Sequence, residues 1–152
     1  MNVEQIRHHL AYSKWASRRL LDAVEAMPSE EQQKDVGVAH KSVTGTLDHI
    51  FFGDLVWLNR IKGTDDTKMS WRDVQDGWDA WAANVTADEL LKEIEYKDLR
   101  GAPRYSPVWQ MVLHVVNHAT LHRGQVMSLL RQSGIAPPQI DLITYYRENN
   151  VK

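Results

Sequence analysis

Apolar residues recur at spacings of three and four along most of the chain, which is the period of an α-helix. This spacing predicts a first helix over residues 2–27, which Pro28 ends. It predicts a second helix over residues 42–62, which Gly63 ends, and a third that begins after Ser70. Serine before a helix and glycine after it are typical of helix ends, so the pattern and its boundaries agree.

The segments between these helices are shorter and less regular. Residues 29–32 resemble a capping box and predict one short turn of helix. A second such signal at residues 86–89 predicts a break near Val85, so that the third arm consists of two helices. Residues 96–105 contain glycine and proline and are expected to be irregular or briefly extended.

The longest helical pattern runs from Ser106 to Gly134. Ser106 is a suitable N-cap, Pro107 suits the first helical position, and Gly134 suits the position after the helix. After Gly134 the chain has a Pro-Pro break and then apolar residues that predict a short helix beginning at Asp141. We expect this tail to dock on the body of the protein.

Four long helical segments without a convincing strand predict an all-α fold, a four-helix bundle with a short C-terminal tail packed on the body. The length of 152 residues favours a single domain over residues 1–152. The second helix is apolar on two sides, and it carries Gly45 and Gly53 one turn from His49. A helix of this kind is usually buried on two sides, so one side can face a partner subunit, and the glycines leave room for another helix or a ligand.

Composition narrows the range of functions. The chain has 18 basic and 20 acidic residues and a net charge of −2, which argues against nucleic acid as a partner. It has no cysteine, so it offers no thiolate as nucleophile or metal ligand. The N-terminal residues do not resemble a signal peptide, and no apolar run approaches the roughly 20 residues of a membrane span. We therefore expect a cytoplasmic protein that does not enter a membrane.

Three histidines on the longest helix, His114, His118 and His122, form one row at intervals of four residues. One helical turn brings two neighbouring imidazoles close enough to bind one metal ion. The outer two are about 12 Å apart along the axis, so only one adjacent pair, His114/His118 or His118/His122, is expected to bind a single ion.

A pair of ligands leaves the site incomplete, because catalytic zinc-like ions usually have three protein ligands and an open position. His49 is the best candidate for the third ligand, since it lies in the middle of the doubly apolar second helix. The remaining histidines, His8, His9 and His40, are interpreted as ordinary surface residues. A buried polar ladder without metal is the alternative explanation of the row.

Three blocks of the chain also resemble a known family. The segments YSKWASRRLLDAVEAMPSEE, GTLDHIFFGDLVWLNRI and HVVNHATLHRGQVMSLLRQSGIAPPQID are similar, in this order, to the DinB-like (YfiT-related) family of small metal-dependent proteins. The last block contains the histidine pair followed by Arg-Gly-Gln and, beyond the helix, a Pro-Pro break. The resemblance covers essentially the whole chain.

The resemblance implies a four-helix bundle, often a homodimer, with a divalent ion, zinc or nickel, bound by three histidines. Carried over by position, these are His49, His118 and His122. This selects the second of the two pairs and leaves His114 one turn away. His114 and Gln125 are then the candidate catalytic residues, Gln125 as a group that orients water or a ligand and His114 as a base or substrate contact. The alternative is that His114 is merely a packed polar residue.

Two classes of function follow. An ion with an open position activates water or a thiolate, which predicts a small-molecule enzyme, either a hydrolase or a low-molecular-weight-thiol transferase. Because the chain has no cysteine, the thiol would be a cosubstrate. The alternative is a non-catalytic, metal-stabilised dimeric stress or binding protein, which the absence of an evident general base favours.

Overall fold

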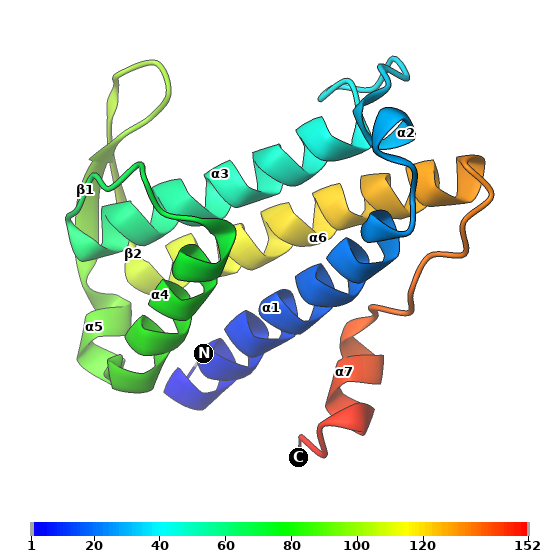
Figure 1. Cartoon of the computed structure of the whole chain (residues 1–152). Helices are drawn as coiled ribbons and strands as arrows, with labels where there is room; N and C mark the ends of the chain where they lie inside the picture. The colour runs from blue at the N-terminus through cyan, green and yellow to red at the C-terminus, as the bar shows by residue number, and fades with distance from the viewer. Residues whose placement is uncertain (1, 152) are drawn as a thin grey trace. The chain divides into compact units, whose positions relative to one another are not determined.

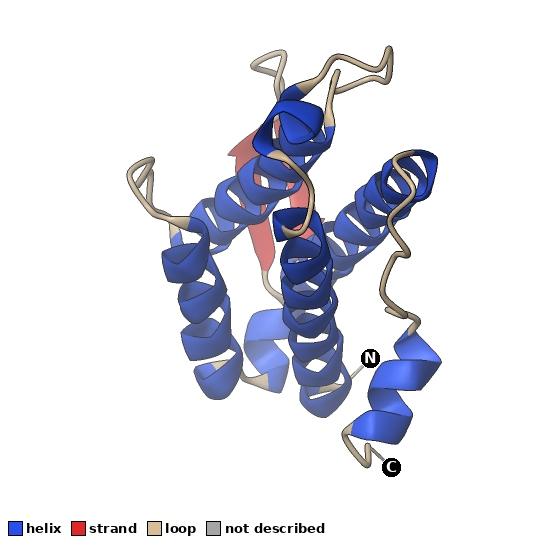
Figure 2. Cartoon of the chain, turned by 45° about the vertical axis from the view of Figure 1, so that its right-hand side comes forward, coloured by secondary structure: helices blue, strands red, loops and turns tan. Residues whose placement is uncertain are grey.

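The computed structural model describes residues 2–151 and is mostly helical (Figures 1 and 2). The elements in chain order are α1 (Val3–Glu25), α2 (Ser29–Gln33), α3 (Val43–Lys62), α4 (Trp71–Asn84), α5 (Ala87–Leu91), β1 (Glu93–Lys97), β2 (Pro103–Pro107), α6 (Val108–Gln132) and α7 (Leu142–Glu148). The predicted long helices are confirmed. The expectation of no strand is wrong, because residues 93–107 form a two-stranded antiparallel hairpin.

The described chain divides into two compact units. One contains the residues up to Ala11 together with Phe51–Asn117, and the other contains Tyr12–Ile50 together with the residues from His118 onward. Helices α1, α3 and α6 each contribute residues to both units.

In the first unit, α4 begins after Ser70, as predicted, at a capping box, and α5 begins at the capping signal predicted for residues 86–89. The Ser70 hydroxyl accepts from the backbone N–H of Asp73, whose carboxylate accepts from the backbone N–H of Ser70. Thr86 and Glu89 make the same reciprocal pair at α5, after a break at Val85. These contacts satisfy backbone donors that the first turn of a helix leaves free. The buried Trp78 packs in this unit and donates its indole N–H to the carbonyl of Asp54 at 3.1 Å.

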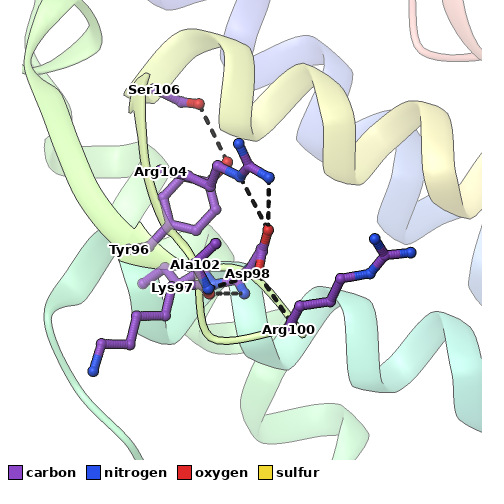
Figure 3. Close-up of polar contacts among 8 residues, drawn as sticks. Tyr96, Lys97, Asp98, Arg100, Ala102, Arg104 and Ser106 are labelled. Carbon is purple, nitrogen blue, oxygen red and sulfur yellow. Dashed lines mark hydrogen bonds and ion pairs between the residues drawn. The ribbon is translucent and has the colours of Figure 1, made fainter.

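The hairpin of β1 and β2 follows, and Figure 3 shows the polar contacts at its turn. The Asp98 carboxylate accepts from the backbone N–H groups of Arg100 and Ala102 and from the Arg104 side chain. These hydrogen bonds, that of Ala102 first, lower the pKa of Asp98. Gly101 has φ +82°, a conformation that favours glycine.

The start of α6 differs from the prediction. Ser106 and Pro107 end strand β2, paired with Ile94 and Glu93, and the helix begins at Val108. Their assignment as N-cap and first helical residue is therefore wrong. The other end agrees with the prediction, because Gly134 has φ +76° and the backbone N–H of Ile135 reaches the carbonyl of Leu130, as in a Schellman motif.

In the second unit, the C-terminal tail docks on α1, as expected (Figure 1). The ring of Tyr145 in α7 lies 5.5 Å from that of Trp15, and the Tyr12 hydroxyl donates to the carbonyl of Ile140. An ion pair of 2.8 Å joins Arg19 to Glu148. Aromatic contacts, a hydrogen bond and an ion pair thus hold the tail against α1.

The short helix α2 lacks the predicted capping box, since Pro28 occupies its N-cap position and no side chain caps it. The Gln32 side chain donates to the carbonyls of Val24 and Met27, so it satisfies the end of α1. Within the described residues, no helix combines the length and apolar character needed to cross a bilayer.

Candidate metal site

Four histidines converge in the second unit, and they come from three parts of the chain. His49 lies in the middle of α3, and His118 and His122 lie one turn apart on α6. His40 belongs to the loop that precedes α3. His122 is buried, and the other three are half-buried.

The rings of His49, His118 and His122 lie close together. The Nε2 atoms of His49 and His118 are 2.9 Å apart. The ring centroid of His122 lies 4.5 Å from those of both His49 and His118. Two nitrogens bound to one tetrahedral zinc, at bond lengths of about 2.0–2.1 Å, are separated by about 3.3 Å. The nitrogens of His49 and His118 therefore already have nearly the spacing of two ligands to one ion.

His40 completes the cluster. Its ring stacks on that of His49, with centroids 3.8 Å apart and planes inclined by 18°. One ring nitrogen from each of His40, His49 and His122 lies within 4.8 Å of the others, an arrangement that could hold a metal ion. The interpretation of His40 as an ordinary surface residue is therefore wrong.

The sequence contains one signal for this position, the glycine at residue 45. A Cβ atom at Gly45 would overlap the carbonyl oxygen of His40. The room that Gly45 leaves is thus taken by the backbone of the preceding loop, and it accommodates neither a second helix nor a ligand. The sequence indicates the space beside Gly45, but it does not identify the segment that fills this space.

Gln125 fixes the orientation of His122. The Nδ1 atom of His122 and Oε1 of Gln125 are 2.8 Å apart. Because this amide oxygen can only accept, Nδ1 carries the proton and donates, which leaves the Nε2 lone pair available for a metal. Such contacts commonly set the tautomer of a metal-binding histidine. Gln125 thus contacts His122 itself, and its predicted role in orienting water or a ligand stays a prediction.

Two of the histidines, His40 and His49, favour the neutral form. Burial, followed by the neighbouring His122, lowers the pKa of His40. Burial, followed by His40 and His122, lowers the pKa of His49. Neutral imidazole is the form that binds metals, so the donor set fits a borderline divalent ion such as zinc or nickel.

His114 has different surroundings. Its ring packs edge-on against Trp57, with centroids 4.8 Å apart. Partial burial and then the positive charge of Arg60 lower the pKa of this imidazole. Arg60 itself lies over the rings of Trp57 and Tyr96 and donates to the carbonyl of Lys97. A role of His114 in catalysis stays a prediction.

Two other residues near the histidine row also occupy defined surroundings. Arg123 is fully buried and donates to the hydroxyls of Ser13, Ser17 and Thr120, so it ties α6 to α1 and points away from the row. Gly124, on the same helix, borders open space. Among the described residues, no heavy atom outside its own helix turn lies within 4 Å of a Cβ built at Gly124.

Helices that bring three or four histidines to one point are typical of a small helical metal-binding protein. Comparison with known sequences gives the family, because the model of the DinB family matches residues 1–150. The chain belongs to the DinB family. It is 22% identical to the protein DinB of Bacillus subtilis (strain 168), over 88% of this chain and 89% of that one.

A solved structure supports the fold. The crystal structure of a DinB-like protein from Bacillus cereus ATCC 10987 matches with a TM-score of 0.58 and 21% identity. The match covers 85% of this chain and 91% of the other. At this level of identity the likeness concerns the fold, and the chemistry has to be argued from the residues of this chain.

Proposed function

We propose that this DinB family protein binds one divalent ion through His49, His118 and His122 and uses it to act on a small molecule. The observation that carries the proposal is the 2.9 Å approach of the Nε2 atoms of His49 and His118 from two different helices. His122 adds a third imidazole, and Gln125 orients it through Nδ1. Zinc or nickel suits this set of neutral nitrogen donors.

A bound ion of this kind would supply an electrophile that activates water or a low-molecular-weight thiol. The residues of the chain contribute binding and orientation. Helices α3 and α6 hold the three ligands. The hydrogen bond to Gln125 keeps the proton of His122 on Nδ1, so that the lone pair on Nε2 is available to the ion. The substrate class is therefore a small molecule that reacts by hydrolysis or by thiol transfer, with the thiol as a cosubstrate. His114 remains the candidate substrate contact.

A second candidate function is favoured by a specific observation, the fourth histidine. Structural zinc sites are usually closed by four protein ligands, whereas catalytic sites keep an open position. With a ring nitrogen of His40 within 4.8 Å of those of His49 and His122, the ion could be fully enclosed by histidines. The protein would then be a metal-stabilised, dimeric binding protein without turnover. In either case we propose that the long helices α1, α3, α4 and α6 form a four-helix bundle and that the protein is a homodimer.

Metal content tests the shared part of the two proposals. Protein purified without a nickel column should carry close to one divalent ion per chain by elemental analysis. His49→Ala and His118→Ala should each lose it, whereas His8→Ala, which removes a histidine paired with Glu4 on α1, should keep it. Equal metal content in all four proteins would overturn the proposed site.

Turnover and stability then separate the two functions. The enzyme proposal predicts metal-dependent activity in a screen of esters, amides and electrophiles with thiol cosubstrates, and loss of that activity in His118→Ala. The binding-protein proposal predicts no turnover, with a lower melting temperature after chelation because the folded state alone binds the ion. A metal-free protein of unchanged stability and oligomeric state would exclude the second function.

A further inference from the structure

The loop of residues 34–42, between α2 and α3, is built around its own hydrogen bonds. The backbone N–H of Val36 donates to the carbonyl of Lys41, and the N–H of Lys41 donates to that of Val38. Lys41 has φ +67°, which is uncommon for a residue with a side chain and costs about 1–2 kcal/mol. A strained position of this kind persists only where its surroundings require it. Here it directly follows His40, the residue that reaches the histidine cluster.

The loop is also fitted to α3. The carbonyl oxygen of His40 lies where a Cβ atom of residue 45 would be, so only glycine at this position admits the loop. The same carbonyl accepts from the backbone N–H of Ser42, whose hydroxyl accepts from the N–H of Gly45. The first turn of α3 therefore determines the position of the His40 backbone, from which the imidazole side chain extends.

The four imidazoles differ in how firmly the chain holds them. His49, His118 and His122 are fixed by continuous α-helices, and the nitrogens of His49 and His118 are already at ligand spacing. His40 is held by a short loop, and one of its ring nitrogens lies within 4.8 Å of those of His49 and His122. Among these four imidazoles it is the one that no helix carries.

We propose that His40 is an exchangeable fourth ligand that occupies the open coordination position at rest and leaves it when an external donor, a small thiolate, binds. The inference rests on the proposed three-histidine site and deepens it. Three helix-borne ligands retain the ion, and the loop-borne ligand protects the remaining position from adventitious donors. Exchange replaces one nitrogen donor by one sulfur donor and leaves the other three bonds intact. The closed and the open forms then correspond to the two functions considered above.

Cobalt(II) in place of the native ion gives a direct readout, because its visible absorption reports the ligands. Loss of a fourth protein ligand should change the spectrum of His40→Ala and lower its cobalt affinity by about tenfold or more. Binding of 2-mercaptoethanol, followed by sulfur-to-cobalt absorption in the near ultraviolet, should instead become tighter. In the wild-type protein the thiolate must first displace His40. The apparent affinity for the thiol is therefore reduced in proportion to the fraction of sites that are open. Opposite changes in the two affinities are the signature of an exchangeable ligand.

His8→Ala is the matched control and should behave like the wild-type protein in both titrations. An unchanged cobalt spectrum and an unchanged thiol affinity in His40→Ala would overturn the inference and leave the three-histidine site intact. Failure of the wild-type protein to bind cobalt, or equal binding by His49→Ala, would instead overturn the proposed function itself. The two failures are therefore distinguishable.

A second variant tests the loop without removing any histidine. Gly45→Ala forces the His40 carbonyl away from α3, so it should show the spectrum and the tighter thiol binding of His40→Ala. Gly124→Ala is the control, because a Cβ there meets no described atom within 4 Å. A Gly45→Ala protein with the wild-type spectrum and thiol affinity would contradict the placement of His40 by the loop.

Discussion

The Nδ1 atom of His122 is engaged by a single amide, that of Gln125, at 2.8 Å. This contact decides which nitrogen of a buried imidazole is free to bind an ion, so its loss should affect metal binding without removing a ligand. The sequence predicted Gln125 as a group that orients water or a ligand, and it did not predict the contact with His122. The tautomer that it sets depends on the side-chain geometry, which spacing does not specify.

Gln125→Ala should lower the affinity for zinc by about 10–100-fold, because the orientation and tautomer of His122 are no longer fixed. The affinity can be measured by competition with a chromophoric chelator. Gln110→Ala, which changes another exposed glutamine of α6, is the matched control and should bind zinc like the wild-type protein. Equal affinities in the two variants would show that Gln125 does not position His122.

His114 should titrate below its ordinary pKa of 6.5, because partial burial and the charge of Arg60 disfavour its protonated form. The unfolded chain then binds more protons than the folded one, so this residue lowers stability as the pH falls below about 6.5 and has no effect well above it. Nuclear magnetic resonance of the ring gives the midpoint directly. Arg60→Gln should raise that midpoint, and the exposed Arg100→Gln should not; a midpoint at or above 6.5 would contradict this account.

At the level of elements, local signals were predicted well and nonlocal ones were not. The helix start after Ser70 and the capping box at residues 86–89 were predicted and are present, whereas the capping box predicted at residues 29–32 is absent. Ser106 and Pro107 carry the signals of a helix start, but pairing with β1 draws them into a strand. His40 was interpreted as a surface residue for the same reason, since a loop residue reaches the site only through contacts made by the fold. The helix-borne histidines could be proposed because their spacing is local.

Substitution by alanine should change the free energy of unfolding in opposite directions at two glycines, one within α6 and one just beyond its end. Gly124 is an exposed position within α6, where alanine should raise the free energy of unfolding by about 1 kcal/mol through helix propensity. Gly134 lies just beyond the helix with φ +76°, where alanine should lower the free energy of unfolding by about 1–2 kcal/mol. Urea denaturation of both variants measures the difference. A change of the same sign in both would contradict the assigned helix end.

For the whole molecule, membership of the DinB family and the likeness to the B. cereus structure support the fold, and the proposed chemistry rests on the histidines of this chain. The chain has no cysteine, so a thiolate at the metal must come from a second molecule. The order of the family blocks along the sequence was sufficient to predict three ligands. The fourth histidine became evident only from the folded chain.

The most direct test of the central claim is anomalous diffraction from crystals of protein purified without a nickel column. The account predicts one metal peak per chain at about 2.0–2.2 Å from Nε2 of His49, His118 and His122. The same data show whether His40 is the fourth ligand. The absence of a peak among these histidines in metal-replete protein, or a peak bound by other residues, would contradict the metal site on which the proposed function rests.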